Sequence, residues 1–216
     1  MDVTTFRVDL VRTVDESYPV VVGRRLDERI AQFLERHRDR RIAVVTDSTV
    51  ESLAVPALAA ALGDRAFDVF AFPAGEASKT RAVKERLEDA MIARGFGRDS
   101  VVVALGGGVV TDLAGFLAAT FTRGVPYVSA PTTLLAAADA AVGGKTAVDT
   151  PAATNLIGAF HQPSAVFVDL DRWLTLSDRH IREGLGETVK HACLADAAFF
   201  GALEDAFVRQ GMTPAQ

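Results

Sequence analysis

A glycine-rich turn near the middle of the chain has the residue types of a phosphate-binding loop. Residues 105–112 read LGGGVVTD and come directly at the end of an apolar run that we expect to form a strand. Glycines let a backbone approach a ligand closely, and the unpaired N–H groups at the start of a helix attract an anion. The turn therefore predicts a pyrophosphate site, and a tight turn that binds nothing is the alternative. Its spacing differs from G-x-G-x-x-G, so a standard Rossmann dehydrogenase is not indicated.

Two further loops place polar side chains after predicted strands. Residues 73–80 read PAGEASKT, in which Ser78 is expected to cap the next helix while Glu76 and Lys79 can reach a ribose or a phosphate. Residues 131–135 read PTTLL, in which Thr132 and Thr133 offer two hydroxyls. Ligands of open α/β sheets bind at the carboxyl ends of the strands. We therefore predict that both loops bind a ligand. The alternative is that their polar residues only cap helices and carry surface charge.

Two later segments carry charges at informative positions. Asp139 and Lys145 lie in the mostly apolar run DAAVGGKT (139–146), where burying either charge is costly unless it is paired or used. A simple salt bridge is the alternative there. In a later predicted helix, Lys190 and His191 come three and four residues after Glu187, so the three side chains can share one face. Helix spacing alone favours a solvent-exposed ion-pair face for this group.

The elements that position these residues follow an alternating order. Short β-branched runs alternate with helical patterns, which is typical of βαβ units and a mostly parallel sheet. We expect strands at Phe6–Arg12, Pro19–Val22, Arg41–Thr46, Phe67–Phe72, Ser100–Leu105, Tyr127–Ala130 and Ala165–Asp169. We expect helices at Leu26–Arg38, Val50–Leu62, Lys79–Arg94, Val109–Ala119 and Thr133–Ala141, and then only helices, at Asp178–Leu194 and Ala197–Gln210. The sequence therefore predicts an α/β domain over residues 1–175 and, over 176–216, the first helices of an incomplete all-α domain.

The composition fits a cytoplasmic globular protein. Hydrophobic residues make up 49% and charged residues 24% of the 216 residues, and the net charge of -5 provides no basic surface for nucleic acid. The single Cys193 excludes an intramolecular disulfide and fits a reducing compartment. The first residues, MDVTTFRVDL, show no basic stretch followed by an apolar run, so we expect no signal peptide. The longest apolar runs are interrupted, and we expect no membrane span.

Seven specific motifs run through nearly the whole chain. They are PAGEASK (73–79), GGGVVTDLAGF (106–116), TRG (122–124), PTTLL (131–135), DAAVGGKTAV (139–148), NLIGAFHQP (155–163) and GLGETVK (184–190). In this order they resemble the dehydroquinate synthase family of sugar-phosphate cyclases. The resemblance implies a Rossmann-like domain that binds NAD, followed by a helical domain that binds metal and substrate.

The resemblance also implies a set of site residues. NAD would be held by the backbone of Arg172–Thr175 and by Gly75, Glu76, Lys79, Gly107, Gly108, Val109, Val110, Thr111, Asp112, Thr132, Thr133, Lys145 and Thr175. The substrate would contact Arg123, Asp139, Lys145, Asn155 and Lys190. Arg123 would reach the substrate phosphate across a homodimer interface. Glu187 matches the first of three ligands of a zinc (or cobalt) ion.

The reaction that the resemblance implies is a step of the shikimate pathway. A small phosphorylated sugar acid, 3-deoxy-arabino-heptulosonate 7-phosphate, would be converted to 3-dehydroquinate and phosphate with catalytic NAD and zinc. One hydroxyl would be oxidised, phosphate would be eliminated, and the hydride would be returned before an aldol step closes the ring. Two positions depart from the family pattern, because Thr154 replaces a usual lysine and Asp149 a usual asparagine. The missing lysine removes a cationic contact to the cofactor region.

The other two zinc ligands in the family are histidines of the helical domain, beyond the last residue given. Of the histidines present, only His191 can approach Glu187, whereas His37 and His180 are expected at the surface and His161 in a loop. We therefore expect an incomplete zinc site, no turnover by this chain alone, and a missing helical half.

Three alternatives stay open at this point. One is a related cyclase that acts on sedoheptulose 7-phosphate or an amino analogue, and another is a non-catalytic NAD-binding or dimerisation module. The third, by fold, is a glycerol-dehydrogenase-like alcohol dehydrogenase. The GGKT, NLIGAFHQP and GLGETVK runs favour a cyclase over that dehydrogenase.

Overall fold

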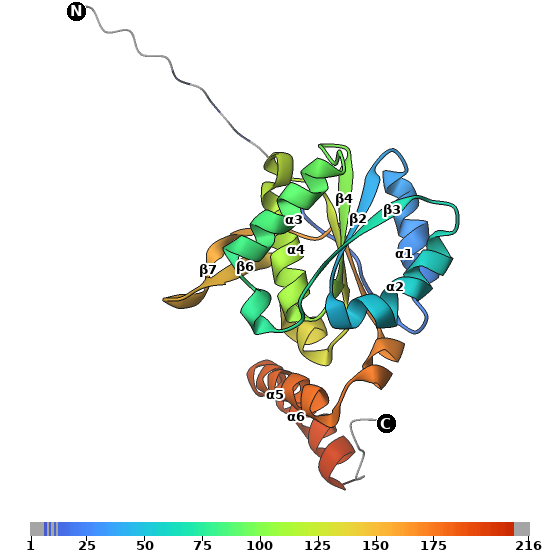
Figure 1. Cartoon of the computed structure of the whole chain (residues 1–216). Helices are drawn as coiled ribbons and strands as arrows, with labels where there is room; N and C mark the ends of the chain where they lie inside the picture. Colours follow the sequence, from blue (N-terminus) through green and yellow to red (C-terminus); the bar gives the residue numbers. More distant parts are fainter. Residues whose placement is uncertain (1–6, 8, 10, 12, 210–216) are drawn as a thin grey trace, which may run out of the picture.

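A parallel sheet forms the centre of the protein, as the alternation of strands and helices predicted. The computed structural model describes residues 7, 9, 11 and 13–209 and is shown in Figure 1. Six strands pair in the order β1-β8-β5-β4-β2-β3, and all of these pairs are parallel. Their bounds are β1 Val20–Gly23, β2 Arg41–Asp47, β3 Phe67–Phe72, β4 Ser100–Gly106, β5 Tyr127–Pro131 and β8 Ala165–Asp169. The predicted strand Phe6–Arg12 falls largely outside the described residues.

Helices cover both faces of the sheet, so the predicted Rossmann-like α/β class is confirmed. Helices α1 (Asp27–Leu34) and α2 (Ser48–Leu62) pack on one face, and α3 (Arg81–Ala93) and α4 (Gly108–Thr120) on the other (Figure 1). Strand β4 is buried along its whole length because it lies between two layers of helices. This position explains its unbroken apolar run, which is typical of a central parallel strand.

Two helices begin at residues whose side chains cap them. Asp47 accepts hydrogen bonds from two backbone N–H groups at the start of α2, and Thr80 accepts one from the N–H of Val83 at the start of α3. The prediction that Ser78 caps the latter helix was wrong. Ser78 lies in a short 3-10 turn, η2 (Glu76–Ser78), and its hydroxyl donates to the carbonyl of Pro73 at 2.5 Å. Thr80 has the extended backbone that a capping residue needs, with φ -129° and ψ 159°.

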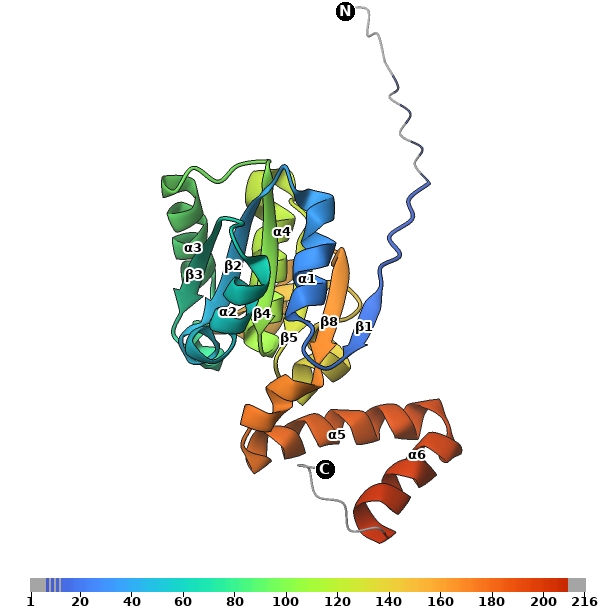
Figure 2. The same cartoon turned by 90° about the vertical axis from the view of Figure 1, so that its right-hand side faces the viewer.

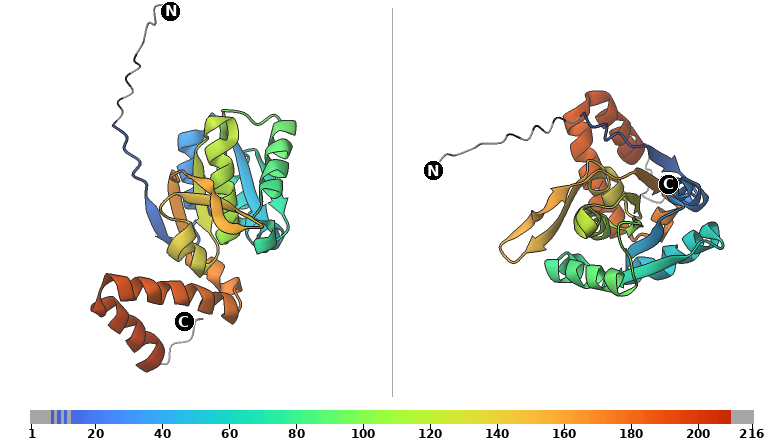
Figure 3. Two further views of the ribbon diagram at one scale, coloured as in Figure 1. Left: turned by 90° about the vertical axis from the view of Figure 1, so that its left-hand side faces the viewer. Right: turned by 90° about the horizontal axis from the view of Figure 1, so that it is seen from above.

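A two-stranded hairpin was not predicted. Strands β6 (Lys145–Thr150) and β7 (Ala153–Phe160) pair antiparallel and lie beside α4 (Figure 3). Glycine makes this approach possible, because a Cβ atom at Gly115 of α4 would lie 2.5 Å from the methyl group of Thr146. The hairpin carries Lys145 and Asn155, two of the candidate substrate residues.

Several shorter elements complete the chain. The predicted helix Leu26–Arg38 divides into α1 and the 3-10 turn η1 (Glu35–His37). The predicted helix Thr133–Ala141 forms over residues 134–140, most of it as the π-helical segment η4 (Ala136–Ala140). The remaining 3-10 turns are η3 (Phe121–Arg123) and η5 (Leu170–Thr175), and the π-helical segment η6 (Asp205–Arg209) directly continues the last helix.

The last two helices lie at the carboxyl ends of the strands. Helix α5 (Asp178–Ala195) runs across this edge of the sheet, and α6 (Ala197–Glu204) turns away from it (Figure 2). At Gly184 a Cβ atom would lie 2.6 Å from Leu134 Cγ, so α5 packs closely on the segment that follows β5. None of the helices within the described residues is both long and apolar enough to span a membrane.

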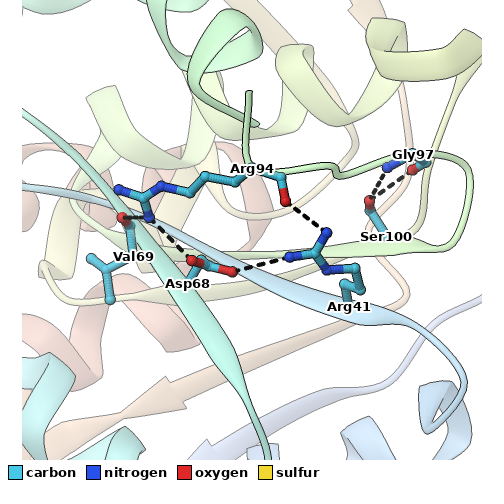
Figure 4. A network of polar contacts seen from close by, with 6 residues as sticks. All are labelled: Arg41, Asp68, Val69, Arg94, Gly97 and Ser100. Carbon is cyan, nitrogen blue, oxygen red and sulfur yellow. Dashed lines mark hydrogen bonds and ion pairs between the residues drawn. The ribbon is translucent and has the colours of Figure 1, made fainter. Parts of the chain in front are cut away.

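The opposite edge of the sheet is held by a polar network (Figure 4). The Asp68 carboxylate pairs with Arg94 at 3.2 Å and with Arg41 at 3.5 Å, and Arg41 also donates to the carbonyl of Arg94 at 2.8 Å. The guanidinium groups lie over Phe70 and Phe96, whose rings pack edge to face. These contacts join the starting ends of β2 and β3 to the end of α3 and leave the carboxyl edge free for a site.

Candidate functional site

A cavity of about 500 Å³ opens at the carboxyl edge of the sheet. We call it the sheet-edge cavity. Five of the candidate cofactor residues line it, from four different loops: Gly75, Gly107, Thr132, Thr133 and Thr175. Parallel strands bring their following loops to one edge, which is why residues 100 positions apart meet here.

The start of α4 offers backbone donors to this cavity. Gly107 stands at the N-cap position of α4, and no side chain caps the helix there. The N–H groups of the first turn are therefore available to an anion, and the helix dipole favours negative charge at this end. The side chains of Val110 and Thr111 are buried, so these two residues can serve a ligand only through their backbone. Gly108 and Val109 complete the first turn.

The paired threonines lie directly beside the glycine loop. The N–H of Thr132 donates to the carbonyl of Gly106 at 2.9 Å, which fixes the two strand ends to each other. The hydroxyl of Thr133 accepts from the N–H of Ala136 at 3.1 Å and keeps its own proton for another partner. A Cβ atom at Gly107 would lie 3.4 Å from the Thr133 methyl group, so the two loops are in van der Waals reach.

A second cavity of about 510 Å³ lies along the hairpin. We call it the hairpin cavity. Four candidate residues line it: Asp112, Asp139, Lys145 and Asn155. Lys145 is exposed at the start of β6, and Asp139 lies in η4. The structure thus brings a cation, two carboxylates and an amide around one space, and three of the four, Asp139, Lys145 and Asn155, are candidate substrate residues.

Lys79 is engaged with two residues that line the hairpin cavity. Its ammonium lies 2.5 Å from Asp112 Oδ2 and donates to Asn155 Oδ1 at 2.6 Å, and Glu76 is farther away at 4.0 Å. Burial raises the pKa of the Asp112 carboxyl, and the hydrogen bond from Lys79 opposes that change. The Lys79 cation is therefore neutralised within the protein, while Glu76 remains exposed to solvent.

The tip of the hairpin is fixed to Lys79 through Asp149. The N–H of Asp149 donates to the Lys79 carbonyl at 2.7 Å, and its carboxylate accepts the N–H of Asn155 at 2.7 Å. Asn155 adopts a left-handed backbone with φ 56°, which asparagine tolerates better than most residues. Thr154, one of the two departures from the family pattern, is exposed beside it.

Glu187, Lys190 and His191 share one face of α5. The Glu187 carboxylate accepts a hydrogen bond from Lys190, which raises the pKa of the Lys190 ammonium, and Asp139 contributes in the same direction. His191 Nε2 lies 3.3 Å from Glu187 Oε1. Over the described part of the chain, no group of three or more His, Cys, Asp or Glu side chains is placed to hold a metal ion.

Arg123 lies away from the other candidates. It follows the C-terminal end of α4, whose 13 residues span roughly 20 Å, whereas the glycine loop lies at the N-terminal end. Arg123 is exposed and has a left-handed backbone with φ 72°. The structure therefore does not bring this arginine to either cavity of its own chain.

Several residues that line the sheet-edge cavity were not predicted from the sequence. These are Asp27, Asp47, Asp169 and Asp171, with the side chain of Arg172. A signal was present for both Asp47 and Asp169, because Asp47 directly follows one predicted strand and Asp169 ends another, at the edge where ligands bind. Asp27 and Arg172 form an ion pair over 145 residues of sequence, which no local pattern indicates. His180, expected at the surface, is exposed and also lines this cavity.

Comparison with known proteins gives a consistent result. Residues 69–183 match the 3-dehydroquinate synthase N-terminal family. The 3-dehydroquinate synthase of Paracoccus denitrificans (strain Pd 1222) is 44% identical over 207 residues, which cover 94% of this chain and 56% of the relative. That of Syntrophotalea carbinolica is 42% identical over 189 residues, covering 86% and 52%. The chain thus spans about half the length of the curated relatives it matches.

Solved structures agree in fold and in sequence. The 2-epi-5-epi-valiolone synthase ValA from Streptomyces hygroscopicus subsp. jinggangensis 5008, solved with NAD+ and Zn2+ bound, superposes with a TM-score of 0.81. It is 37% identical, over 95% of this chain and 56% of that one. An iron-containing alcohol dehydrogenase from Thermotoga maritima shares the fold alone, with 18% identity and a TM-score of 0.66 over 81% of this chain and 52% of that one. Motifs, fold and sequence similarity agree, and this chain belongs to the 3-dehydroquinate synthase family.

Proposed function

We propose that this chain is the NAD-binding part of a 3-dehydroquinate synthase-type cyclase. The observation that carries the proposal is the uncapped start of α4, which faces the sheet-edge cavity between the glycine loop and the paired threonines. A cavity of this size at the carboxyl ends of parallel strands fits a dinucleotide in part, with its pyrophosphate at the helix start. The bound NAD+ of ValA, a relative at 37% identity, supports the same assignment.

The cofactor residues follow from the cavity. Backbone donors of Gly107–Val110, the hydroxyls of Thr132 and Thr133, and the segment up to Thr175 would hold NAD. Gly75 would allow close approach from the next loop, because its φ of 109° suits glycine. NAD supplies a reversible hydride acceptor when it is bound. Glu76, Lys79, Thr111 and Asp112 belong to the set by family resemblance alone, because they do not line the sheet-edge cavity.

The substrate would occupy the hairpin cavity. Lys145 provides a cation there for a phosphorylated sugar acid, and Asp139 and Asn155 provide an acceptor and an amide. Lys190 lies on α5, which packs on η4. Arg123 would act in a homodimer, because its position at the far end of α4 excludes a role in either cavity of its own chain.

The residues that the structure describes do not complete a zinc site. Glu187 and His191 supply two donors, whereas a catalytic zinc needs three protein ligands and an open position. We therefore propose that residues 176–216 are part of a helical metal and substrate domain whose further ligands lie elsewhere. Incubation of this chain with the sugar acid phosphate and NAD should release no inorganic phosphate. Steady-state release would contradict this expectation.

A second candidate is a cyclase that acts on sedoheptulose 7-phosphate. The similarity to ValA, a 2-epi-5-epi-valiolone synthase, over 95% of the chain favours a cyclase with a substrate other than the sugar acid phosphate. The two candidates share the cofactor site and differ only in substrate. An experiment that distinguishes them therefore needs a chain that includes the helical half. Phosphate release from the sugar acid phosphate would support the first, and release of phosphate only from sedoheptulose 7-phosphate would support the second.

The proposed NAD site is tested by Gly107→Asp. A carboxylate at the N-cap should bond to the free N–H groups of α4 and preserve or slightly raise the melting temperature. The site has room, because the nearest atom to an added Cβ is 3.4 Å away. The same carboxylate should repel the pyrophosphate and abolish NAD binding in isothermal titration. Gly107→Ala is the matched control and should bind NAD more weakly by less than about tenfold. Unchanged NAD affinity in Gly107→Asp would rule out this site.

A further inference from the structure

One wall of the sheet-edge cavity is formed by a short segment with little core packing of its own. The 3-10 turn η5 contributes Asp171, Arg172 and Thr175 to the cavity, and α5 follows directly. None of the six residues of η5 is fully buried, although Leu170 and Trp173 pack partly on a small apolar cluster. Apolar packing alone therefore does little to fix the position of η5.

Polar contacts attach the wall to the turn between β1 and α1. The Asp169 carboxylate, at the end of β8, accepts the N–H groups of Arg25, Leu26 and Asp171 at 3.1, 2.8 and 3.0 Å. Asp169 therefore fixes the first residues of η5. Beyond Asp171, a second polar contact joins η5 to the start of α1.

That contact is the ion pair between Arg172 and Asp27. One guanidinium nitrogen lies 2.5 Å from Asp27 Oδ1, and the two side chains are only 14% and 15% exposed. Burial raises the pKa of Asp27, and the charge of Arg172 opposes this change. The neighbouring pair Arg24–Asp171 has the same distance of 2.5 Å, but its side chains are 62% and 33% exposed. Sheltered charge pairs constrain geometry strongly, whereas exposed pairs contribute little.

We propose that Asp27 and Arg172 are positioning residues that fix the η5 wall of the sheet-edge cavity and thereby set the affinity for NAD. This inference rests on the proposed function of the cavity. Arg172 acts by holding the segment up to Thr175 against the cavity, and Asp27 acts by holding Arg172. Both residues also line the cavity, so a loss of the pair changes the shape of the site itself.

A double-mutant cycle tests the pair. NAD affinity is measured by isothermal titration for the unaltered chain, Asp27→Asn, Arg172→Gln and the double variant, at a temperature where each remains folded by near-ultraviolet circular dichroism. Each single variant should bind about tenfold more weakly, and the double variant should bind no more weakly than the weaker single one, because both changes break one interaction. Arg172→Lys keeps the cation and should recover part of the affinity.

Arg24→Gln is the matched control, because it removes the exposed pair on the same segment and should change NAD affinity by less than about twofold. A purely structural pair would lower the melting temperature and leave NAD affinity unchanged, which would overturn the inference alone. The inference would also be overturned if Arg172→Gln weakened NAD binding while Asp27→Asn left it unchanged. In that case the Arg172 guanidinium would contact NAD directly. If the unaltered chain binds no NAD, the proposed function fails, and this inference fails with it.

Discussion

At the scale of single residues, the buried charge of Lys79 depends on partners from distant parts of the chain. Its side chain is 7% exposed and meets Asp112 and Asn155. A buried ammonium of this kind is stable only with such partners, because transfer of an unpaired charge from water is costly. Lys79 therefore joins the start of α4 to the hairpin.

Lys79→Met should destabilise the fold by leaving the Asp112 carboxylate buried without a cation. Burial already raises the pKa of Asp112, so the loss of Lys79 should raise it further. We expect the free energy of unfolding to fall by about 3 kcal/mol in urea denaturation. The double variant with Asp112→Asn removes both charges and should lose less than Lys79→Met alone. A larger loss in the double variant would show that the pair is not the source of the effect.

Tyr127 predicts how stability changes at alkaline pH. Its hydroxyl donates to the His161 carbonyl at 3.2 Å, and burial raises its pKa above the ordinary value of 10.0. The unfolded chain therefore releases the phenolic proton first, so the stability due to this group is present below pH 10 and is lost as the pH rises above it. Tyr127→Phe should lower stability at pH 8 and flatten the decline between about pH 10 and 11.5. The measurement is the urea midpoint of the unaltered chain and of Tyr127→Phe across this pH range. An equal decline of the two midpoints would refute the role given to Tyr127.

The candidate residues show what sequence can and cannot predict at this scale. The glycine loop, Thr132 and Thr133 were expected at one edge and meet there, because each follows a parallel strand. Contacts between side chains were not predictable, since Lys79 and Asn155 are 76 residues apart and Asp27 and Arg172 are 145 apart. Such pairs follow from the tertiary fold, which no local pattern contains.

At the scale of elements, the hairpin β6–β7 was missed for a physical reason. Strand β7 contains Gly158 and is exposed or half-buried throughout, and β6 is buried only at its centre, so neither strand is a continuous buried apolar run. The six sheet strands were predicted to within one residue, because central parallel strands are continuous apolar runs bounded by turn residues. The hairpin instead depends on the close fit of Gly115 and Thr146, which is a property of two elements together.

Gly115→Ala tests that fit. The added Cβ would lie 2.5 Å from the Thr146 methyl and 3.4 Å from the Tyr127 ring, so the hairpin must shift. We expect a net loss of about 1–3 kcal/mol in the free energy of unfolding, although alanine is the better helix former. Gly186→Ala in α5 is the control, because no atom lies within 4 Å of its added Cβ. It should stabilise the chain by up to about 1 kcal/mol. Equal effects at both positions would contradict the role given to Gly115.

At the scale of the whole molecule, nearly all of the buried apolar core lies in the α/β body, and the last helices bury little. Leu117 of α4 is fully buried, whereas Leu194 of α5 is 77% exposed and no residue of α6 is buried. Two helices without further elements cannot enclose a core, which is why their apolar side chains stay largely exposed.

Replacing a leucine by alanine should cost much more stability in α4 than in α5. Leu117→Ala should lower the free energy of unfolding by about 2–5 kcal/mol, because it leaves a cavity in the core. Leu194→Ala should change it by less than about 0.5 kcal/mol. Urea unfolding followed by circular dichroism measures both. A large loss for Leu194→Ala would mean that α5 folds in one cooperative unit with the sheet through this residue.

The network of Asp68, Arg41 and Arg94 also has a practical use. Arg98, in the adjoining turn before β4, is exposed and lines neither cavity. A dye or a sensor surface attached through Arg98→Cys would therefore leave the ligand-facing edge open. The exposed Cys193 must first be replaced by serine, so that labelling occurs at a single thiol.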